Sequence, residues 1–101
     1  SMERVVNLAE LKAAAVALID SLIQLHGKDT IAIDPDADFY WEVPLEALYE
    51  VKGTQPQLDV GRVSDDWEFI RPVAADSGAA TPLALIHLAP VLRYLSERVK
   101  P

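Results

Sequence analysis

The sequence predicts a mostly α-helical fold: a small single-domain bundle in which an N-terminal and a C-terminal amphipathic helix pack together. Two observations predict it, namely leucine stripes with helical spacing near both ends of the chain and cap residues beside those stripes. The chain has 101 residues, half of them apolar and a quarter charged, which suits one globular domain. We expect a middle segment of short helices and extended stretches to lie across the two long helices.

The first helix is predicted over residues 7–26. Asn7 can cap its N-terminus together with Glu10 three residues on, and Gly27 suits the position just after its last turn. Its apolar stripe recurs at intervals of three and four residues and comprises Leu8, Leu11, Ala15, Leu18, Leu22 and Leu25. Ser1 and Met2 are interpreted as a tag remnant and the start methionine.

The last helix is predicted over residues 81–99, with Thr81 as N-cap and Pro82 at the first helical position. Pro90 lies inside it and removes one backbone donor, so we expect a kink there. The apolar stripe comprises Leu85, Leu88, Leu92, Leu95 and Val99. Two stripes of similar length would bury each other in an antiparallel pair. The predicted core comprises Leu11, Leu18, Leu22, Trp67, Leu88, Leu92 and Leu95.

Between these helices the elements are shorter. A proline at a first helical position and a closing glycine predict a short helix over residues 44–52. A second helix is predicted over residues 64–73, with Ser64 as its N-cap and aspartates in its first turn. Residues 29–33 alternate like a short strand, although a packed loop fits them as well, and residues 58–63 are another extended candidate.

Charge and cysteine content exclude several function classes. The net charge is −7, and residues 29–76 carry twelve acids against three bases. Such an acidic segment repels phosphate, so the sequence predicts neither nucleic-acid binding nor adhesion to a membrane surface, and it favours a basic protein partner. There is no cysteine, which excludes disulfides and cysteine zinc sites and favours a cytoplasmic location.

Three alternate aspartates invite comparison with a calcium-binding loop. Asp34, Asp36 and Asp38 match its first odd-numbered ligand positions. The sixth position, which requires glycine, is Phe39, and the twelfth, which requires a bidentate glutamate, is Leu45. We therefore expect no metal site and no other cofactor.

The sequence shows no recognisable catalytic motif. It has neither a glycine-rich phosphate loop nor a nucleophile elbow nor a paired-histidine zinc motif. His26 suits the negative end of the first helix, and His87, beside the last stripe, is interpreted as structural. We assign no catalytic residue and favour a protein that is not an enzyme.

Aromatic residues supply the candidate binding surface. In an extended run, Phe39 and Trp41 share one face and Tyr40 lies on the other. We expect Trp41 and Trp67 to cover the core and Tyr40 to point outward among acidic residues, as an anchor for a basic partner. The candidate partner-binding residues are Asp34, Asp36, Asp38, Tyr40 and Glu42.

The stretches DFYWEVPLEALYEV and LDVGRVSDDWEFI carry one resemblance. They are similar to small bacterial proteins with the pattern D-x-F/Y-Y-W-x-I/V-P followed by G-x-V/L-x-D-D-W, a group without an assigned activity. This chain departs from the first pattern in one respect, because Asp38 directly precedes Phe39. The resemblance covers about a third of the chain. It implies a small bacterial cytoplasmic protein and implies nothing about catalysis.

Three hypotheses for function follow. The favoured one is a non-enzymatic interaction module, such as an inhibitor or immunity-type protein that covers a basic site on its partner. The second is a homodimeric structural or scaffold subunit, whose leucine stripes extend across the subunit interface. The third is a small metal-dependent enzyme that uses Asp34, Asp36, Asp38 and His87.

Overall fold

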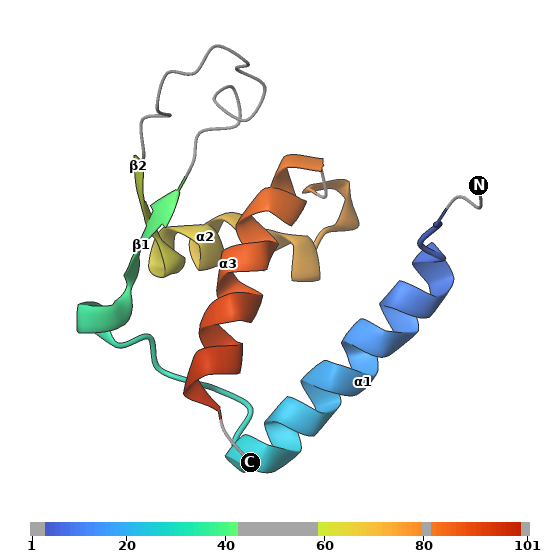
Figure 1. Ribbon diagram of the computed structural model, residues 1–101, viewed down its shortest axis with the longest axis horizontal. Helices are drawn as coiled ribbons and strands as arrows, with labels where there is room; N and C mark the ends of the chain where they lie inside the picture. Colours follow the sequence, from blue (N-terminus) through green and yellow to red (C-terminus); the bar gives the residue numbers. More distant parts are fainter. Residues whose placement is uncertain (1–3, 43–58, 80–81, 100–101) are drawn as a thin grey trace. The chain divides into compact units, whose positions relative to one another are not determined.

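The computed structural model describes residues 4–42, 59–79 and 82–99 and is largely helical, as predicted (Figure 1). Its α-helices are α1 (Leu8–His26), α2 (Val63–Ile70) and α3 (Pro82–Arg98), and its strands are β1 (Phe39–Glu42) and β2 (Asp59–Arg62). Short 3-10 turns cover Pro35–Ala37, Arg71–Ala74 and Ser77–Ala79. The chain divides into two compact units: unit 1 holds residues 1–31 and 98–101, and unit 2 holds residues 32–97.

Unit 1 is built on α1, whose ends are capped as the sequence predicted. Asn7 is the N-cap, and its side-chain oxygen accepts a hydrogen bond from the backbone N–H of Glu10 at 3.0 Å. Gly27 ends the helix in the left-handed conformation, with φ of 78°, and its N–H donates to the carbonyl of Ile23. Glycine adopts this conformation without steric cost, which explains its place at the helix end.

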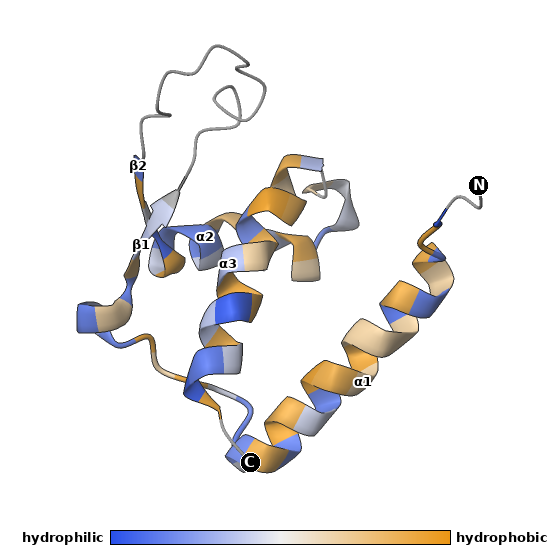
Figure 2. Cartoon of the chain, in the orientation of Figure 1, coloured by the Kyte–Doolittle hydropathy of each residue, from blue (hydrophilic) through white to orange (hydrophobic). Residues whose placement is uncertain are grey.

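The apolar stripe of α1 is exposed within unit 1. None of its residues is buried, and Leu11 and Leu18, both predicted in the core, are 54% and 70% exposed. Figure 2 shows hydrophobic residues along the whole helix, interleaved with hydrophilic ones. A single helix has no second element in its own unit against which to bury such a stripe. The predicted packing of the first helix on the last would join the two units, and it stays a prediction.

Unit 2 contains an antiparallel pair of strands, β1 and β2. Phe39 lies opposite Arg62, Tyr40 opposite Gly61 and Trp41 opposite Val60. Because side chains alternate along a strand, the first and third of these pairs share one face of the sheet and the second pair occupies the other. β2 corresponds to the extended stretch predicted over residues 58–63, whereas residues 29–33 form a loop.

Helix α2 follows β2 directly and differs in one respect from the prediction. The N-cap is Arg62, whose side chain makes no capping hydrogen bond, and Ser64 lies inside the first turn. The prediction that Ser64 is the N-cap was therefore wrong. After Ile70 the chain tightens into the 3-10 turn Arg71–Ala74, so the predicted helix over residues 64–73 is an eight-residue α-helix plus this turn.

Helix α3 runs without interruption from Pro82 to Arg98, and Pro90 lies inside it. Proline has no N–H to donate to the carbonyl four residues earlier, which belongs to Ile86, so the helical ladder lacks one bond there. Thr81, the predicted N-cap, and the predicted short helix over residues 44–52 lie outside the described residues.

The hydrophobic core of unit 2 is small and differs from the predicted one. Among the described residues, Val63 and Tyr94 are the buried hydrophobic side chains, at 4% and 5% exposure. Trp67 and Leu92, predicted in the core, are 42% and 40% exposed. Their predicted burial requires the first helix to pack on the last, so it stays a prediction. Two polar residues, Asp38 and Asp66, are also buried, at 4% exposure each. None of the helices in the described ranges is long and apolar enough to cross a bilayer.

Gly61 is required by the aromatic ring that covers it. A Cβ atom at this position would overlap the ring of Tyr40, its cross-strand partner. Glycine thus lets the tyrosine lie flat across the second strand and reach the helices behind it.

We predict that Gly61→Ala destabilises the fold by about 1 to 3 kcal/mol, the usual cost of overpacking a filled site. Urea denaturation followed by circular dichroism measures the change. In a Tyr40→Leu background the same substitution should cost much less, because the ring that it would meet is absent. Equal costs in both backgrounds would contradict this explanation.

Candidate functional site

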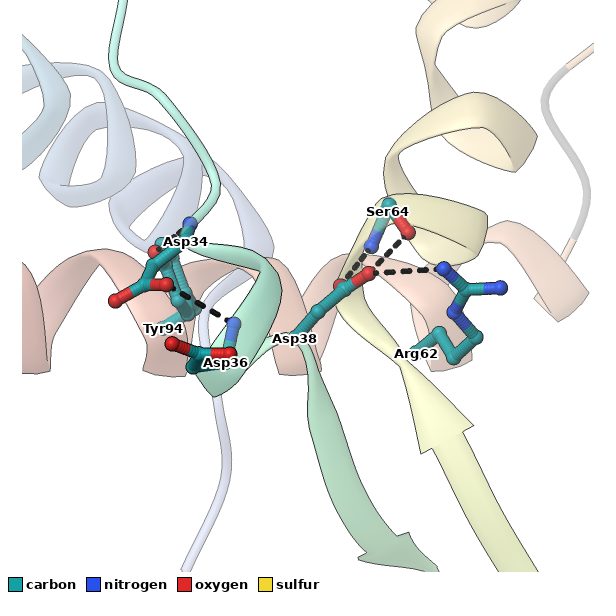
Figure 3. A network of polar contacts seen from close by, with 6 residues as sticks. All are labelled: Asp34, Asp36, Asp38, Arg62, Ser64 and Tyr94. Atoms are coloured by element: carbon teal, nitrogen blue, oxygen red, sulfur yellow. Dashed lines mark hydrogen bonds and ion pairs between the residues drawn. The ribbon is translucent and has the colours of Figure 1, made fainter.

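The carboxylate of Asp38 closes the N-terminus of α2 from outside the helix. It accepts hydrogen bonds from the Ser64 N–H at 2.7 Å and from the Ser64 hydroxyl at 2.5 Å, and Arg62 Nη2 lies 3.5 Å away (Figure 3). The backbone carbonyl of Asp38 also accepts from the Val63 N–H at 2.9 Å. The first N–H groups of a helix have no partner inside it, and the residue just before β1 supplies one here. This explains why α2 needs no capping side chain of its own.

Burial and hydrogen bonding act on Asp38 in opposite directions. Burial on its own would raise the pKa of Asp38, because it disfavours the charged form. The hydrogen bonds from Ser64 and the charge of Arg62 outweigh burial, and they lower the pKa below its ordinary value of 3.8. The side chain is therefore an ionised structural group and not a free acid on the surface.

Asp34 and Asp36 belong to a separate turn. An Asp34 side-chain oxygen accepts from the Asp36 N–H at 2.9 Å, and the Asp34 N–H donates to the hydroxyl of Tyr94 at 2.8 Å. Figure 3 shows these residues grouped apart from Asp38, which turns toward Ser64. In the described ranges, no cluster of three or more histidines and carboxylates could hold a metal ion. The Asp34 side chain thus shapes the turn, and the Asp38 side chain closes the N-terminus of α2.

A second buried carboxylate joins three elements. Asp66 Oδ2 accepts from the hydroxyl of Tyr40 at 2.5 Å, and Asp66 Oδ1 lies 2.6 Å from Nδ1 of His87. The imidazole of His87 also stacks on Phe69, with ring centroids 4.1 Å apart. Asp66 is 4% exposed, and both of its oxygens have partners. This network, which connects β1, α2 and α3, was not predicted from the sequence.

The network fixes the orientation of His87. A carboxylate on Nδ1 fixes the orientation of an imidazole, as in acid–base catalysis. Within the described residues the hydrogen bonds of His87 lead to Asp66 alone, and the serine of α2, Ser64, is hydrogen-bonded to Asp38. The arrangement suits a structural role that ties α3 to α2.

Of the predicted binding residues, Tyr40 has the opposite orientation from the one expected. Its hydroxyl reaches Asp66, so Tyr40 points into unit 2 and not outward. Asp38 is buried at 4% exposure, Asp34 is half-buried and Asp36 is exposed. Glu42 ends β1 opposite Asp59. The expectation that Asp38 and Tyr40 form an open binding surface was wrong.

The other side of the strand pair carries the exposed aromatic residues. Phe39 and Trp41 are 57% and 72% exposed, and Val60 opposite Trp41 is 55% exposed. The guanidinium of Arg62 lies over the Phe39 ring, 5.1 Å from its centroid. We call Phe39, Trp41, Val60 and Arg62 the exposed sheet face. The prediction that Trp41 covers the core was therefore wrong, because Tyr40 takes the inward position.

A cavity of about 510 Å³ lies between β1 and one side of α3. Aromatic side chains form much of its wall, and Arg93 and Glu97 contribute the charged groups. Its lining comprises Ala37, Phe39, Tyr40, Trp41, Val63, Ile86, Ala89, Pro90, Arg93, Tyr94 and Glu97. The volume falls within the range of small-molecule pockets, roughly 300 to 1,000 Å³.

Comparison of the chain with protein-family models, with curated proteins and with solved structures found no match.

We predict that Asp38→Asn lowers the free energy of unfolding by about 1.5 to 3 kcal/mol near neutral pH, the usual worth of hydrogen bonds to a charged group. The amide cannot accept from both Ser64 donors and attract Arg62 as the carboxylate does. Urea denaturation measures the change. The matched control is Asp36→Asn, an exposed position with the same loss of charge, which should stay within about 0.5 kcal/mol of wild type.

The variants Asp38→Asn and Asp36→Asn should also differ in how their free energy of unfolding depends on pH. Because the folded pKa of Asp38 is lowered, its stabilisation is complete above the ordinary value of 3.8 and is lost as the pH falls through the folded pKa. The acid-side slope of stability should therefore be shallower in Asp38→Asn than in Asp36→Asn. Parallel slopes would contradict the assigned role.

Proposed function

We propose that the protein is a non-enzymatic interaction module that binds a basic protein through its exposed sheet face. The single observation that carries the proposal is the exposure of Phe39 and Trp41, at 57% and 72%, on one face of the strand pair. Large aromatic side chains are usually buried, and tryptophan and tyrosine dominate the energetics of protein interfaces. An aromatic pair held outward by a rigid strand is suited to that use.

The framework behind this face supports the proposal. Tyr40, between Phe39 and Trp41, is fixed by its hydrogen bond to Asp66 and by its position over Gly61. Fixing one strand position fixes its neighbours on the opposite face, because side chains alternate. Phe39 and Trp41 are thus preorganised, which lowers the entropy cost of binding.

Charge supports a basic partner. The described residues of unit 2, which are 32–42, 59–79 and 82–97, contain ten acids and three arginines. Each arginine lies in an ion pair with a carboxylate of the same unit: Arg62 with Asp38, Arg71 with Glu68 and Arg93 with Glu97. The surplus is negative, so long-range attraction would raise the association rate with a positively charged protein.

The residues predicted from the sequence to bind a partner have different roles in this proposal. Asp36 keeps a steering role as an exposed acid, whereas Asp38 and Tyr40 act through the framework. An inhibitor or immunity-type protein that covers a basic site in the cytoplasm would combine these features.

Site-specific photocrosslinking in cells of the native host tests the proposal. With a photoreactive phenylalanine derivative in place of Trp41, we predict a crosslinked product with one protein of basic isoelectric point. The control places the same derivative at Glu68, an exposed position on α2 outside the exposed sheet face, and should give no such product. Equal crosslinking from both positions would overturn the proposal.

Binding kinetics with the purified partner give a second arm of this test. Trp41→Ala should weaken binding by about tenfold or more, mainly through faster dissociation, since a buried aromatic anchor is worth about 2 kcal/mol. Asp36→Asn should mainly slow association and reduce its dependence on salt. If both variants bind like wild type, the exposed sheet face is not the contact surface.

A homodimer is the second candidate, and the exposed stripe of α1 favours it. Its apolar residues include Leu8, Leu11, Val16, Leu18, Ile19, Ile23 and Leu25, each at least 42% exposed. Stripes of this kind pack together in helical dimers. Light scattering after gel filtration would then give twice the mass of one chain for wild type and for the polar-face control Lys12→Ser, and the monomer mass for Leu18→Ser. A monomeric wild type would reject this candidate.

A further inference from the structure

We propose that the cavity between β1 and α3 receives a single basic side chain of the partner, an arginine or a lysine. This inference rests on the proposed function and names the chemical group that the module recognises. Two observations support it: the residues that line the cavity, and the contact between the Arg62 guanidinium and the Phe39 ring within the chain.

The cavity is formed by two regular elements of unit 2. Three consecutive residues of β1 line it, which places it along the strand and not on one face alone. The α3 side is a helical stripe at intervals of three and four residues: Ile86, Ala89, Pro90, Arg93, Tyr94 and Glu97. Four aromatic residues contribute to the wall, namely Phe39, Tyr40, Trp41 and Tyr94.

Aromatic walls of this kind bind cations. The face of an aromatic ring is electron-rich, and a guanidinium or ammonium group is attracted to it most strongly at tryptophan. The chain already contains one such contact, because the Arg62 guanidinium lies 5.1 Å from the centroid of Phe39. A partner's guanidinium would find the same chemistry at Trp41, which is more exposed than Phe39.

Acceptors for the charged head are present at the α3 side. Glu97 pairs with Arg93 across 3.5 Å, and both side chains are largely exposed, at 64% and 83%. Exposed ion pairs of this type are weak, so an incoming cation can replace Arg93. Pro90, which also lines the cavity, has no N–H to donate to the carbonyl of Ile86, so that carbonyl lacks its usual helical donor.

The charge of the surroundings selects a cation over an anion. Within the cavity wall the charges of Arg93 and Glu97 balance, while the rest of unit 2 is strongly acidic among its described residues. A carboxylate or phosphate would be repelled by this field, and a basic side chain would be attracted. Its alkyl stem would contact Ala37, Ala89 and the proline ring.

The test is an NMR titration of the full chain with short peptides blocked at both ends. The first peptide carries one arginine among glycines and serines, and the second replaces it by citrulline, which keeps the shape without the charge. We predict that the arginine peptide shifts the amide signals of Ala37, Ala89 and Tyr94 and binds at least tenfold more tightly than the citrulline peptide. A glutamate peptide should not bind.

Two substitutions with the same loss of charge locate the site. Glu97→Gln should weaken arginine-peptide binding by about threefold to tenfold, whereas Glu68→Gln should leave it unchanged, although both remove a glutamate from an exposed ion pair with arginine. Arg93→Gln should strengthen binding, because it removes the competing cation. Circular dichroism would check that each variant folds like wild type.

Equal binding of the arginine and citrulline peptides, absence of binding by either, or equal effects of Glu97→Gln and Glu68→Gln would each overturn the inference. None of these outcomes bears on crosslinking from Trp41, so failure here is distinguishable from failure of the proposed function. Crosslinking failure together with arginine-selective peptide binding would instead leave the cavity as a cation site without the proposed protein partner.

Discussion

The carboxylate of Asp66 is the contact on which the arrangement of unit 2 depends. It comes from α2 and binds the hydroxyl of Tyr40 on β1 and the imidazole of His87 on α3, so one buried side chain ties three elements together. Few hydrophobic side chains are buried in the described part of this unit, and polar contacts therefore determine its geometry. Buried polar groups specify one arrangement strongly, because each unsatisfied donor or acceptor is costly.

The face that β1 presents to solvent follows from this contact. A shift of one residue along a strand would exchange its two faces, and in hydrophobic terms Phe39 and Trp41 suit the inside better than Tyr40 does. The phenol satisfies Asp66, and Gly61 leaves space for its ring. Asp38, just before the strand, adds a second constraint by closing the N-terminus of α2.

The sequence predicted the features that depend on local physics. Leucine spacing located α1 and α3, and cap residues located the ends of α1, because helix ends and amphipathic stripes are determined by neighbouring residues. The orientation of Tyr40 and the role of Asp38 could not be predicted in this way, since their partners lie 26 residues away along the chain. The exposed aromatic pair was missed for the same reason. Alternation along the strand places Phe39 and Tyr40 on different faces of the sheet, but it does not determine which of these faces is turned inward. For Asp66 the sequence offered one signal, which is its place in the DDW motif beside Trp67, a tryptophan that is 42% exposed.

The exposure of both tryptophans has a consequence for spectroscopy. Trp41 and Trp67 are 72% and 42% exposed in the folded chain, so water contacts both side chains before unfolding. The fluorescence emission of Trp41, the more exposed of the two, should lie near that of free tryptophan in water and should change little when the protein unfolds. Contact with a partner that covers Trp41 would shift the emission to shorter wavelength, which makes the intrinsic fluorescence of this protein a sensitive signal of association and a poor signal of denaturation.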